Sequence, residues 1–229
     1  MKTDDIIREA VDVLRSGGVI LYPTDTVWGI GCDATNPEAV SRVFAIKRRS
    51  DSKSLVLLAA DLDMVARYVK VIPNIAIDLV EVNDRPMTLI YPGAICGTAP
   101  AALVRSGASI GEPERPLSGK VPLNSSPAPQ LAARHLLAWN TVAEDGSIGI
   151  RIPLPGFWRD LVARLGRPLV STSANISGEP TPRRFAEISP EIRDAVDYAV
   201  PAHLERGASG SASQIIKVGL GGEVEIIRA

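Results

Sequence analysis

The sequence predicts an α/β protein built on a twisted, mixed sheet. Short apolar runs typical of buried strands alternate along the chain with segments of helical periodicity, and the connections are of both hairpin and crossover length. Apolar residues make up 45% of the 229 residues and charged residues 22%, a balance that predicts a buried core. The length suits one large domain or two small ones.

The first half of the chain alternates predicted helices and strands. Residues 4–16 place apolar side chains on one helical face, and Gly17-Gly18 ends that helix. The run Asn36-Pro37-Glu38 has the pattern of a capped helix start and leads into a second helical segment. The other elements expected here are strands at 19–22, 54–59 and 87–91 and helices at 61–69 and 74–82.

The second half opens with an irregular stretch. Residues 105–130 are rich in Pro, Gly and Ser, which predicts a loop or a partly disordered insertion. Regular patterns then resume with a strand at 147–152, a helix at 157–165, a strand at 168–173, a helix near 189–196, and two strands within 213–228 joined at Gly221-Gly222.

Composition excludes several classes of protein. The formal net charge of −1 excludes nucleic-acid binding by bulk positive charge, although a local basic patch remains possible. The two cysteines, Cys32 and Cys96, are too few for a disulfide-dense scaffold or a four-cysteine zinc site. The two histidines, His135 and His203, form no metal-binding motif, so we expect no metal ligands among the side chains.

No targeting or membrane segment is expected. The first ten residues are charged and do not resemble a signal peptide. The longest uncharged stretch, 86–104, is interrupted by prolines and glycines and is not a credible spanning helix. The sequence therefore predicts a soluble, cytoplasmic protein that does not associate with membranes.

The segment YPTDTVWGIG, residues 22–31, follows a predicted buried strand. Thr24 and Thr26 flank Asp25 there, and we interpret the segment as a loop at the end of a strand, where α/β proteins bind ligands. The alternative is a structural turn whose threonine side chains satisfy the local backbone. On this segment alone, the structural turn is slightly favoured.

The segment KRRSDSK, residues 47–53, concentrates positive charge. Five basic residues and one acidic residue lie between Arg42 and Lys53, in a protein that is close to neutral as a whole. Such a cluster suits a triphosphate, because arginine offers phosphate a planar fork and lysine a point charge. It equally suits a solvated helix C-terminus, and the run alone does not decide between the two.

Two further features suggest a small-molecule site. Residues 171–182, STSANISGEPTP, carry more hydroxyl and amide side chains than a capping loop needs, and they suit phosphate, ribose or an amino-acid head group. Arg151 interrupts an apolar strand and requires an anionic partner. That partner is either a carboxylate of the protein, the commoner case, or a carboxylate of the substrate.

Taken together, these segments resemble the YrdC-like threonylcarbamoyl-AMP synthase family, in its single-domain bacterial form. The YPTDTVWG, K-x-R and STSAN pieces are specific in combination. The matching segments cover most of the chain in order: 17–34, 45–58, 85–94, 145–153, 168–182 and 213–228.

The resemblance implies one domain over residues 1–229, with a twisted mixed sheet, flanking helices and a concave basic cleft. It implies a nucleotidyltransferase that condenses L-threonine, bicarbonate and ATP to threonylcarbamoyl-AMP and pyrophosphate, with Mg²⁺ accompanying ATP. The product would pass to a separate threonylcarbamoyl transferase complex that modifies tRNA. Direct contact with tRNA or another RNA is a further expectation.

Site residues also follow from the resemblance, position by position. Those that match threonine contacts are Thr26, Arg151, Ser171 and Ser213. Those that match ATP contacts are Lys47, Arg49, Lys53, Ser147, Ser173, Asn175, Thr181 and Arg228. Lys47 and Arg49 form the K-x-R pair on the phosphates and are the expected catalytic residues.

The chain departs from the family pattern at three places. Ser50 and Ser54 replace prolines of many members, and Leu58 replaces a histidine of some members, which puts one threonine contact in question. Residues 98–141 are longer than in typical members and are expected to form a Pro/Ser/Gly-rich insertion, either a surface loop or a lid or docking segment.

One competing hypothesis is a non-catalytic RNA-binding paralogue that uses the same cleft. An RNA groove does not need the set formed by Thr26, Arg151 and Ser171, so the enzyme is favoured. A second alternative, carbamoyl transfer to a different acceptor, is disfavoured because the extra regions of the larger proteins with that activity are missing from this sequence.

Overall fold

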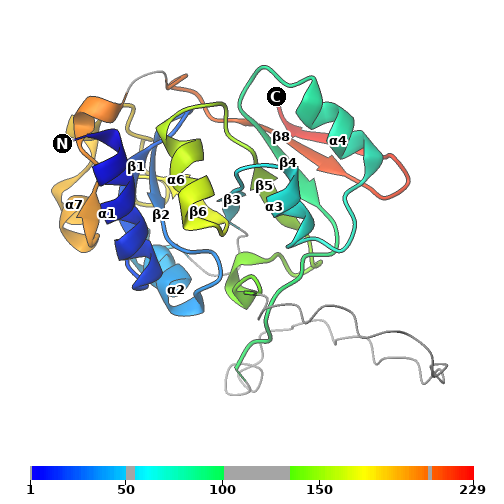
Figure 1. The fold of residues 1–229 in the computed structure, drawn as a ribbon, viewed down its shortest axis with the longest axis horizontal. Helices are drawn as coiled ribbons and strands as arrows, with labels where there is room; N and C mark the ends of the chain where they lie inside the picture. The colour runs from blue at the N-terminus through cyan, green and yellow to red at the C-terminus, as the bar shows by residue number, and fades with distance from the viewer. Residues whose placement is uncertain (1, 50–54, 101–134, 206–207) are drawn as a thin grey trace.

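The computed structural model describes residues 2–49, 55–100, 135–205 and 208–229 (Figure 1). Its strands are β1 (Ile20–Pro23), β2 (Trp28–Gly31), β3 (Val56–Leu58), β4 (Met87–Tyr91), β5 (Ile148–Arg151), β6 (Leu169–Ser173), β7 (Tyr198–Ala199), β8 (Gln214–Val218) and β9 (Val224–Arg228). They form one sheet of nine described strands in the order β7-β1-β2-β6-β3-β5-β4-β8-β9. Three pairs are parallel and the other five antiparallel, which confirms the mixed sheet.

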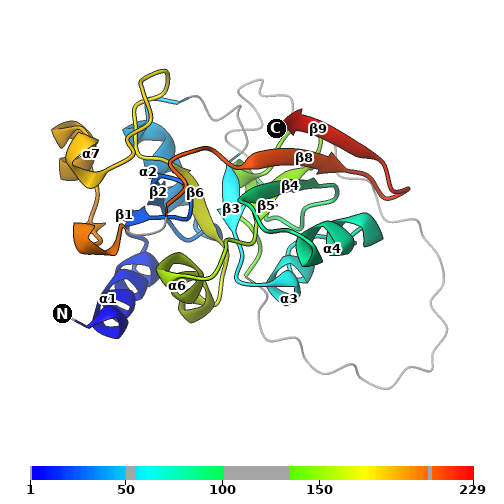
Figure 2. The ribbon, with the colours of Figure 1, turned by 90° about the horizontal axis from the view of Figure 1, so that it is seen from above.

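Helices cover the sheet on both sides. The described helices are α1 (Thr3–Arg15), α2 (Pro37–Ile46), α3 (Leu62–Ala66), α4 (Asn74–Glu81), α6 (Phe157–Leu165) and α7 (Pro190–Ala195), with short 3₁₀ turns η1 (Trp139–Thr141), η2 (Phe185–Glu187) and η3 (Ala202–Leu204). Figure 2 shows α1, α6, α3 and α4 along one face, with α2 and α7 towards the other. In the described ranges, no helix has the length and apolar character to cross a bilayer.

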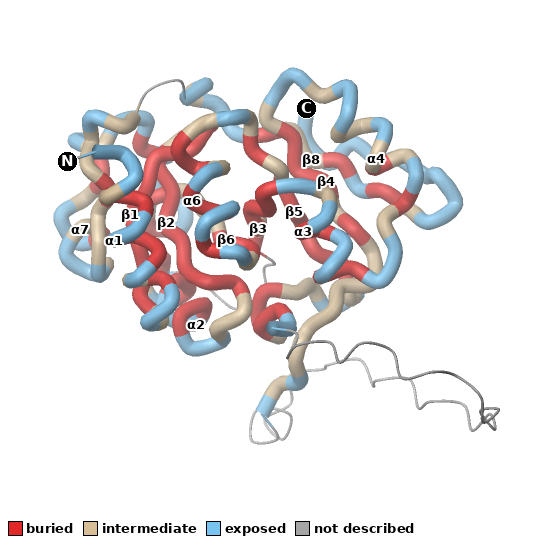
Figure 3. Tube along the Cα trace, in the orientation of Figure 1, coloured by how far each residue is buried: buried red, intermediate tan, exposed pale blue. Residues whose placement is uncertain are grey.

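The helix predictions are confirmed, except that α3 ends at Ala66 and is shorter than the predicted 61–69. The predicted apolar face of α1, which includes Ile6, Val11 and Leu14, is buried. The side chain of Asn36 caps α2 by accepting hydrogen bonds from the backbone N–H groups of Glu38 and Ala39, at 3.0 and 3.1 Å. Figure 3 shows β1, β2 and β5 buried and the outer helix faces exposed, as expected for a layered α/β core. The edge strand β9 is exposed along its whole length.

The prediction of one continuous loop over residues 22–31 is wrong. Residues 28–31 form β2, which pairs with β1 as a hairpin and with β6 on its other side. Gly31 packs so closely that an added Cβ would lie 2.4 Å from the carbonyl oxygen of Val170. This glycine therefore permits close packing and does not open the backbone to a ligand.

The C-terminal end of the long stretch 98–141 belongs to the fold. Leu137, Ala138 and Thr141 are buried, and the N–H of Ala138 donates to the carbonyl of Ala34 at 2.8 Å. The central part of the predicted insertion, 101–134, lies outside the described residues, as do Ser50, Lys53 and Ser54.

Candidate functional site

A cavity of about 620 Å³ lies against the sheet, on the face that carries Gly149 and Arg151. Its lining combines arginines, hydroxyl residues and a few apolar side chains. The lining residues are Thr24, Thr26, Val27, Trp28, Gly29, Arg49, Leu55, Val56, Thr88, Ile90, Gly149, Arg151, Ser171, Thr172, Ser173, Thr181, Arg183, Gly210, Ala212, Ser213, Ile215 and Arg228. Their charged members are all arginines, which confirms a basic cavity.

Paired strand residues form the floor of this cavity. Val56 of β3 pairs with Ser171 of β6 on one side and with Gly149 of β5 on the other. Gly149 in turn pairs with Ile90 of β4. Residues paired directly across a sheet point to the same face, so these side chains form one row across four strands. Gly149 leaves the middle of the row open.

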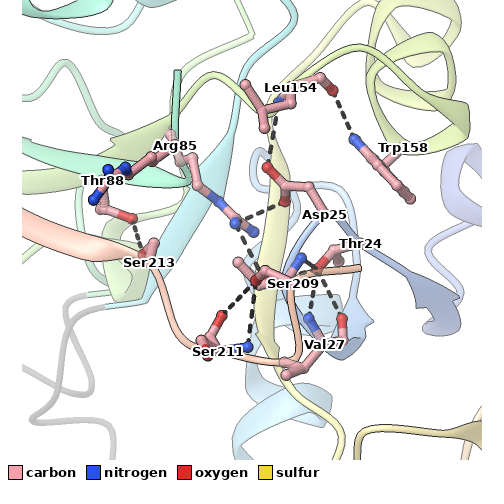
Figure 4. A network of polar contacts seen from close by, with 12 residues as sticks. Thr24, Asp25, Val27, Arg85, Thr88, Leu154, Trp158, Ser209, Ser211 and Ser213 are labelled. Atoms are coloured by element: carbon pink, nitrogen blue, oxygen red, sulfur yellow. Dashed lines mark hydrogen bonds and ion pairs between the residues drawn. The ribbon is translucent and has the colours of Figure 1, made fainter. Parts of the chain in front are cut away.

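Arg151 is held by a carboxylate of the protein. Its Nη1 lies 2.8 Å from Oδ1 of Asp25 and 3.3 Å from the hydroxyl of Thr26. Asp25 and Arg151 are 2% and 4% exposed, and Oδ2 of Asp25 accepts a hydrogen bond from the N–H of Leu154 at 3.2 Å. Of the two partners left open by the sequence, the protein carboxylate is therefore present. Figure 4 shows Asp25 with its hydrogen bond from Leu154.

The guanidinium of Arg151 retains capacity for a ligand. Its buried Nε–H has no hydrogen-bond partner among the described residues, and the side chain lines the cavity. Burial lowers the pKa of Arg151, and the negative charge of Asp25 opposes that shift. A buried donor without a partner is costly, so this geometry suits an anionic ligand such as a carboxylate.

The turn between β1 and β2 positions Thr26. The hydroxyl of Thr24 donates to the carbonyl of Val27 at 2.7 Å and lies 2.8 Å from the hydroxyl of Thr26. The carbonyls of Asp25 and Thr26 accept hydrogen bonds from the N–H groups of Ser209 and Gly210. The turn is therefore structural in its bonding, and Thr24 and Thr26 also line the cavity.

Lys47 and Arg49, the expected catalytic pair, lie in different surroundings. Arg49 lines the cavity, and its partial burial lowers its pKa. The ammonium of Lys47 is buried away from the lining and donates to the carbonyl oxygens of Ser173 and Asn175, at 2.6 and 2.7 Å. In this structure Lys47 thus holds the loop that follows β6.

Burial and the neighbouring charge of Arg49 lower the pKa of Lys47 from 10.5 to about 8. The folded protein therefore releases this proton at lower pH than the unfolded chain, and the contribution of Lys47 to stability rises from about pH 8 towards pH 10.5. Over this pH range, we expect the unfolding free energy of the wild type to rise relative to that of Lys47→Met. Urea unfolding at about pH 7.5 and about pH 9.5 measures the gap, and a constant gap would contradict the prediction.

The predicted segment 171–182 begins within β6, and part of its predicted set lines the cavity. Ser171, Ser173 and Thr181 line the cavity. Asn175 is not a lining residue, and its amide donates to the carbonyls of Ile176 and Glu179 at 3.0 and 2.7 Å, which stabilises the loop.

Of the remaining predicted residues that the structure describes, Ser213 and Arg228 line the cavity and Ser147 does not. The guanidinium of Arg228 donates two hydrogen bonds to the carbonyl of Ser213, at 2.9 and 2.6 Å. Ser147 is buried before β5. Hydrogen bonds from the Ser147 side chain and from its backbone N–H, the latter at 3.0 Å, lower the pKa of Asp145.

Thr88, Trp28 and Arg183 line the cavity and were not expected from the sequence. Thr88 lies in a strand, where threonine normally serves packing, so the sequence carries no signal for it. Trp28 lies within YPTDTVWG, the segment interpreted above as a possible ligand loop, and that position is the signal that could have identified it. Leu58, which replaces a family histidine, is fully buried and paired with Arg151, and it is not a lining residue.

The chain was compared with protein families and curated proteins. It matches the Sua5/YciO/YrdC family model, described as telomere recombination, over residues 12–111 and 126–229. It is 33% identical over 191 residues to a threonylcarbamoyl-AMP synthase of Stenotrophomonas maltophilia, covering 83% of each chain. It is also 33% identical over 210 residues to one of Xanthomonas euvesicatoria, covering 91% of each.

Solved structures share the fold. Sua5 of P. abyssi complexed with L-threonine superposes with a TM-score of 0.66 at 22% identity, covering 93% of this chain and 50% of that one. The present chain thus spans about half of that protein. YciO of E. coli superposes with a TM-score of 0.65 at 21% identity, covering 99% and 89%. On the family match and the curated relatives, the chain belongs to the Sua5/YciO/YrdC family.

Proposed function

We propose that the protein is a threonylcarbamoyl-AMP synthase, a nucleotidyltransferase that converts L-threonine, bicarbonate and ATP into threonylcarbamoyl-AMP and pyrophosphate. The observation that carries the proposal is one cavity with two kinds of anion-binding group. Arg151 is a buried arginine fixed by a carboxylate, and Arg49 and Arg183 are more accessible arginines among hydroxyl residues. The two similar bacterial proteins are both named threonylcarbamoyl-AMP synthase.

Arg151 suits the carboxylate of the amino acid. Its unpartnered Nε–H faces no competing acceptor among the described residues, and a guanidinium recognises a carboxylate with defined geometry. The hydroxyls of Thr26, Ser171 and Ser213 line the same cavity and offer further donors and acceptors. The resemblance assigns threonine contacts to these same residues.

The nucleotide and its phosphates are matched by four lining residues: Arg49, Ser173, Thr181 and Arg228. Arg183, which was not expected from the sequence, lines the cavity with them. The other residues assigned to ATP by resemblance, Lys47, Lys53, Ser147 and Asn175, remain part of the proposal. Mg²⁺ is taken to enter with ATP as part of the substrate. In the described ranges, no group of three His, Cys, Asp or Glu side chains gathers that could hold a metal ion.

The reaction proceeds in two bond-forming steps. The threonine nitrogen bonds to the carbon of bicarbonate, and water leaves to give a carbamate. A carbamate oxygen then bonds to the α-phosphorus, and the bond from that phosphorus to the bridging oxygen of pyrophosphate breaks, with the electron pair leaving on pyrophosphate. The arginines stabilise charge and the hydroxyls orient the reactants, so no covalent enzyme intermediate is required.

The product would serve a separate transferase complex that modifies tRNA, which implies a cytoplasmic enzyme. An RNA-binding paralogue without activity is less well supported, because a groove for RNA has no use for a buried Asp25–Arg151 pair beneath a small cavity. RNA binding would also weaken steeply with salt.

Measuring pyrophosphate release from ATP and bicarbonate with each amino acid in turn tests the proposal. L-Threonine should support release well above the other amino acids. A flat profile, or no release with any amino acid, would contradict the synthase and favour a binding role.

Gly149 gives a second test, because it keeps the cavity floor open. An added Cβ would lie 3.5 Å from Cγ2 of Thr88 and 3.8 Å from Cγ2 of Val56, which is ordinary contact. Gly149→Val should therefore change the unfolding free energy by less than about 1.5 kcal/mol. The variant should lower kcat/KM at least about tenfold, because the methyl groups of the valine occupy the part of the cavity where the substrate would bind. Full activity in a folded Gly149→Val protein would contradict this use of the cavity.

A further inference from the structure

Glu205 links two walls of the cavity that are far apart in the sequence. Its Oε2 accepts a hydrogen bond from the indole N–H of Trp28 at 2.7 Å and another from the backbone N–H of Phe185 at 2.9 Å. Trp28 lines the cavity from β2, and Phe185 begins η2, directly after the stretch that carries Thr181 and Arg183. Glu205 is half-buried and is not itself a lining residue. One carboxylate oxygen therefore holds β2 and the start of η2 together.

Ring contacts reinforce this link. The ring centroids of Trp28 and Phe185 lie 5.0 Å apart with an interplanar angle of 55°, an arrangement that favours aromatic pairs. The guanidinium carbon of Arg193 lies 5.8 Å from the centroid of the Phe185 ring, within the range of a cation–π interaction. Trp28 is 1% exposed, so its indole N–H would be costly to leave without an acceptor. The carboxylate of Glu205 accepts that hydrogen bond and holds Phe185 beside the indole.

The stretch 181–184 depends on such contacts, because it belongs to no helix or strand. It supplies Thr181 and Arg183 to the cavity lining, on the side that the proposed function gives to the nucleotide. The backbone N–H of Arg183 donates to the carboxylate of Glu187 at 2.8 Å, and this bond stays within the local segment. The bond accepted by Glu205 instead joins the end of the stretch to β2. The position of these two lining residues relative to the rest of the cavity therefore depends on Glu205.

We propose that Glu205 is a positioning residue for the nucleotide, which keeps Thr181 and Arg183 in place by accepting the N–H groups of Trp28 and Phe185. The proposal rests on the proposed function for the identity of the nucleotide. The role requires an acceptor oxygen and not a negative charge, because a carboxylate near bound phosphates adds only repulsion. Glutamine keeps a carbonyl oxygen at this position, whereas methionine keeps the length of the side chain without a comparable acceptor.

The test measures the Kd for ATP by calorimetry, with Mg²⁺ and without threonine or bicarbonate, and then the KM values in pyrophosphate release. Glu205→Met should raise the Kd and the KM for ATP at least about tenfold, because small displacements of binding groups cause losses of this size. The KM for threonine at saturating ATP should stay within about twofold, because it is the nucleotide side that moves and the turn between β1 and β2 keeps its own hydrogen bonds. Glu205→Gln should bind ATP at least as tightly as the wild type.

Asp197 provides the matched control. Its Oδ2 accepts a hydrogen bond from the backbone N–H of Val19 at 2.7 Å, so this carboxylate also joins segments that are far apart in the sequence. Neither residue lines the cavity. Asp197→Leu should lower the free energy of unfolding, as Glu205→Met should, but leave the Kd for ATP unchanged. Loss of stability alone is thereby separated from loss of positioning.

The outcomes separate this role from the proposed function. An unchanged Kd for ATP in Glu205→Met would overturn the role alone, and so would an equal loss of affinity in Glu205→Gln. ATP binding by the wild type without threonine-dependent release would overturn the proposed function, while the Kd values would still decide the role of Glu205. No ATP binding by the wild type would overturn both. If Glu205→Met does not fold, Trp28→Phe removes one of the two donors and should raise the Kd for ATP at least about threefold, and an unchanged Kd there would overturn the role.

Discussion

Replacing Arg49 with alanine is expected to slow threonine-dependent pyrophosphate release by about 30- to 1000-fold, which corresponds to about 2–4 kcal/mol of transition-state stabilisation. Arg49 lines the cavity and is half-buried, so its charge acts where solvent screening is reduced. Negative charge on the pyrophosphate grows as it leaves, so the loss should fall mainly on kcat and on the affinity for ATP. The KM for threonine should change little.

The adjacent residue provides a matched control. Arg48 is exposed, forms an ion pair with Glu191 and does not line the cavity. Its φ of 49° lies in the left-handed region, which glycine adopts without strain. Arg48→Gly therefore removes the same charge one residue away and should leave turnover unchanged. Equal losses in both variants would indicate a general effect of charge, and an unchanged Arg49→Ala protein would contradict the role of Arg49.

Local patterns predicted most of the fold. The strand at 87–91 and the helix at 157–165 were predicted with the bounds that the structure gives them. Both combine a clear apolar period with turn or cap residues at their ends, so local sequence decides them. Helix α2 was predicted from its cap, since asparagine followed by proline is typical of a helix start.

Strand β2 was missed because its stability comes from tertiary contacts. The sequence WGIG has two glycines in four residues, a pattern that predicts a loop. The segment becomes a strand because β1 and β6 pair with it on both sides and because Gly31 fits beneath the carbonyl of Val170. Strand β7 has two residues, too few for a periodic signal.

The candidate site was predictable where residue type was unusual for its element. An arginine within an apolar strand and the dense hydroxyls at the end of β6 both identified cavity residues. The sequence placed Asp25 in a candidate ligand loop but did not predict its ion pair with Arg151. That pair joins residues far apart in sequence and depends on the register of the sheet. Thr88 is ordinary in a strand, and only the neighbouring Ser213 and the cavity give its hydroxyl significance.

Replacing Arg151 with glutamine is expected to raise the KM for threonine more than about 100-fold and to destabilise the fold by about 3–5 kcal/mol. The first effect follows from the loss of charged hydrogen bonds to the substrate carboxylate. The second follows because the carboxylate of Asp25, 2% exposed, loses its counter-charge. Steady-state kinetics and urea unfolding measure the two effects separately.

The double variant Asp25→Asn/Arg151→Gln distinguishes binding from folding. Both buried charges are then absent, and the amide that replaces the Asp25 carboxylate still offers an oxygen to the N–H of Leu154, which bonds to Asp25 in the wild type. We expect the double variant to recover at least about 2 kcal/mol of the lost stability, because no buried charge remains uncompensated. Threonine use should stay as low as in Arg151→Gln, since Asp25 acts only by holding the arginine in place. Recovery of activity together with stability would show that the arginine supports the fold and does not bind the substrate carboxylate.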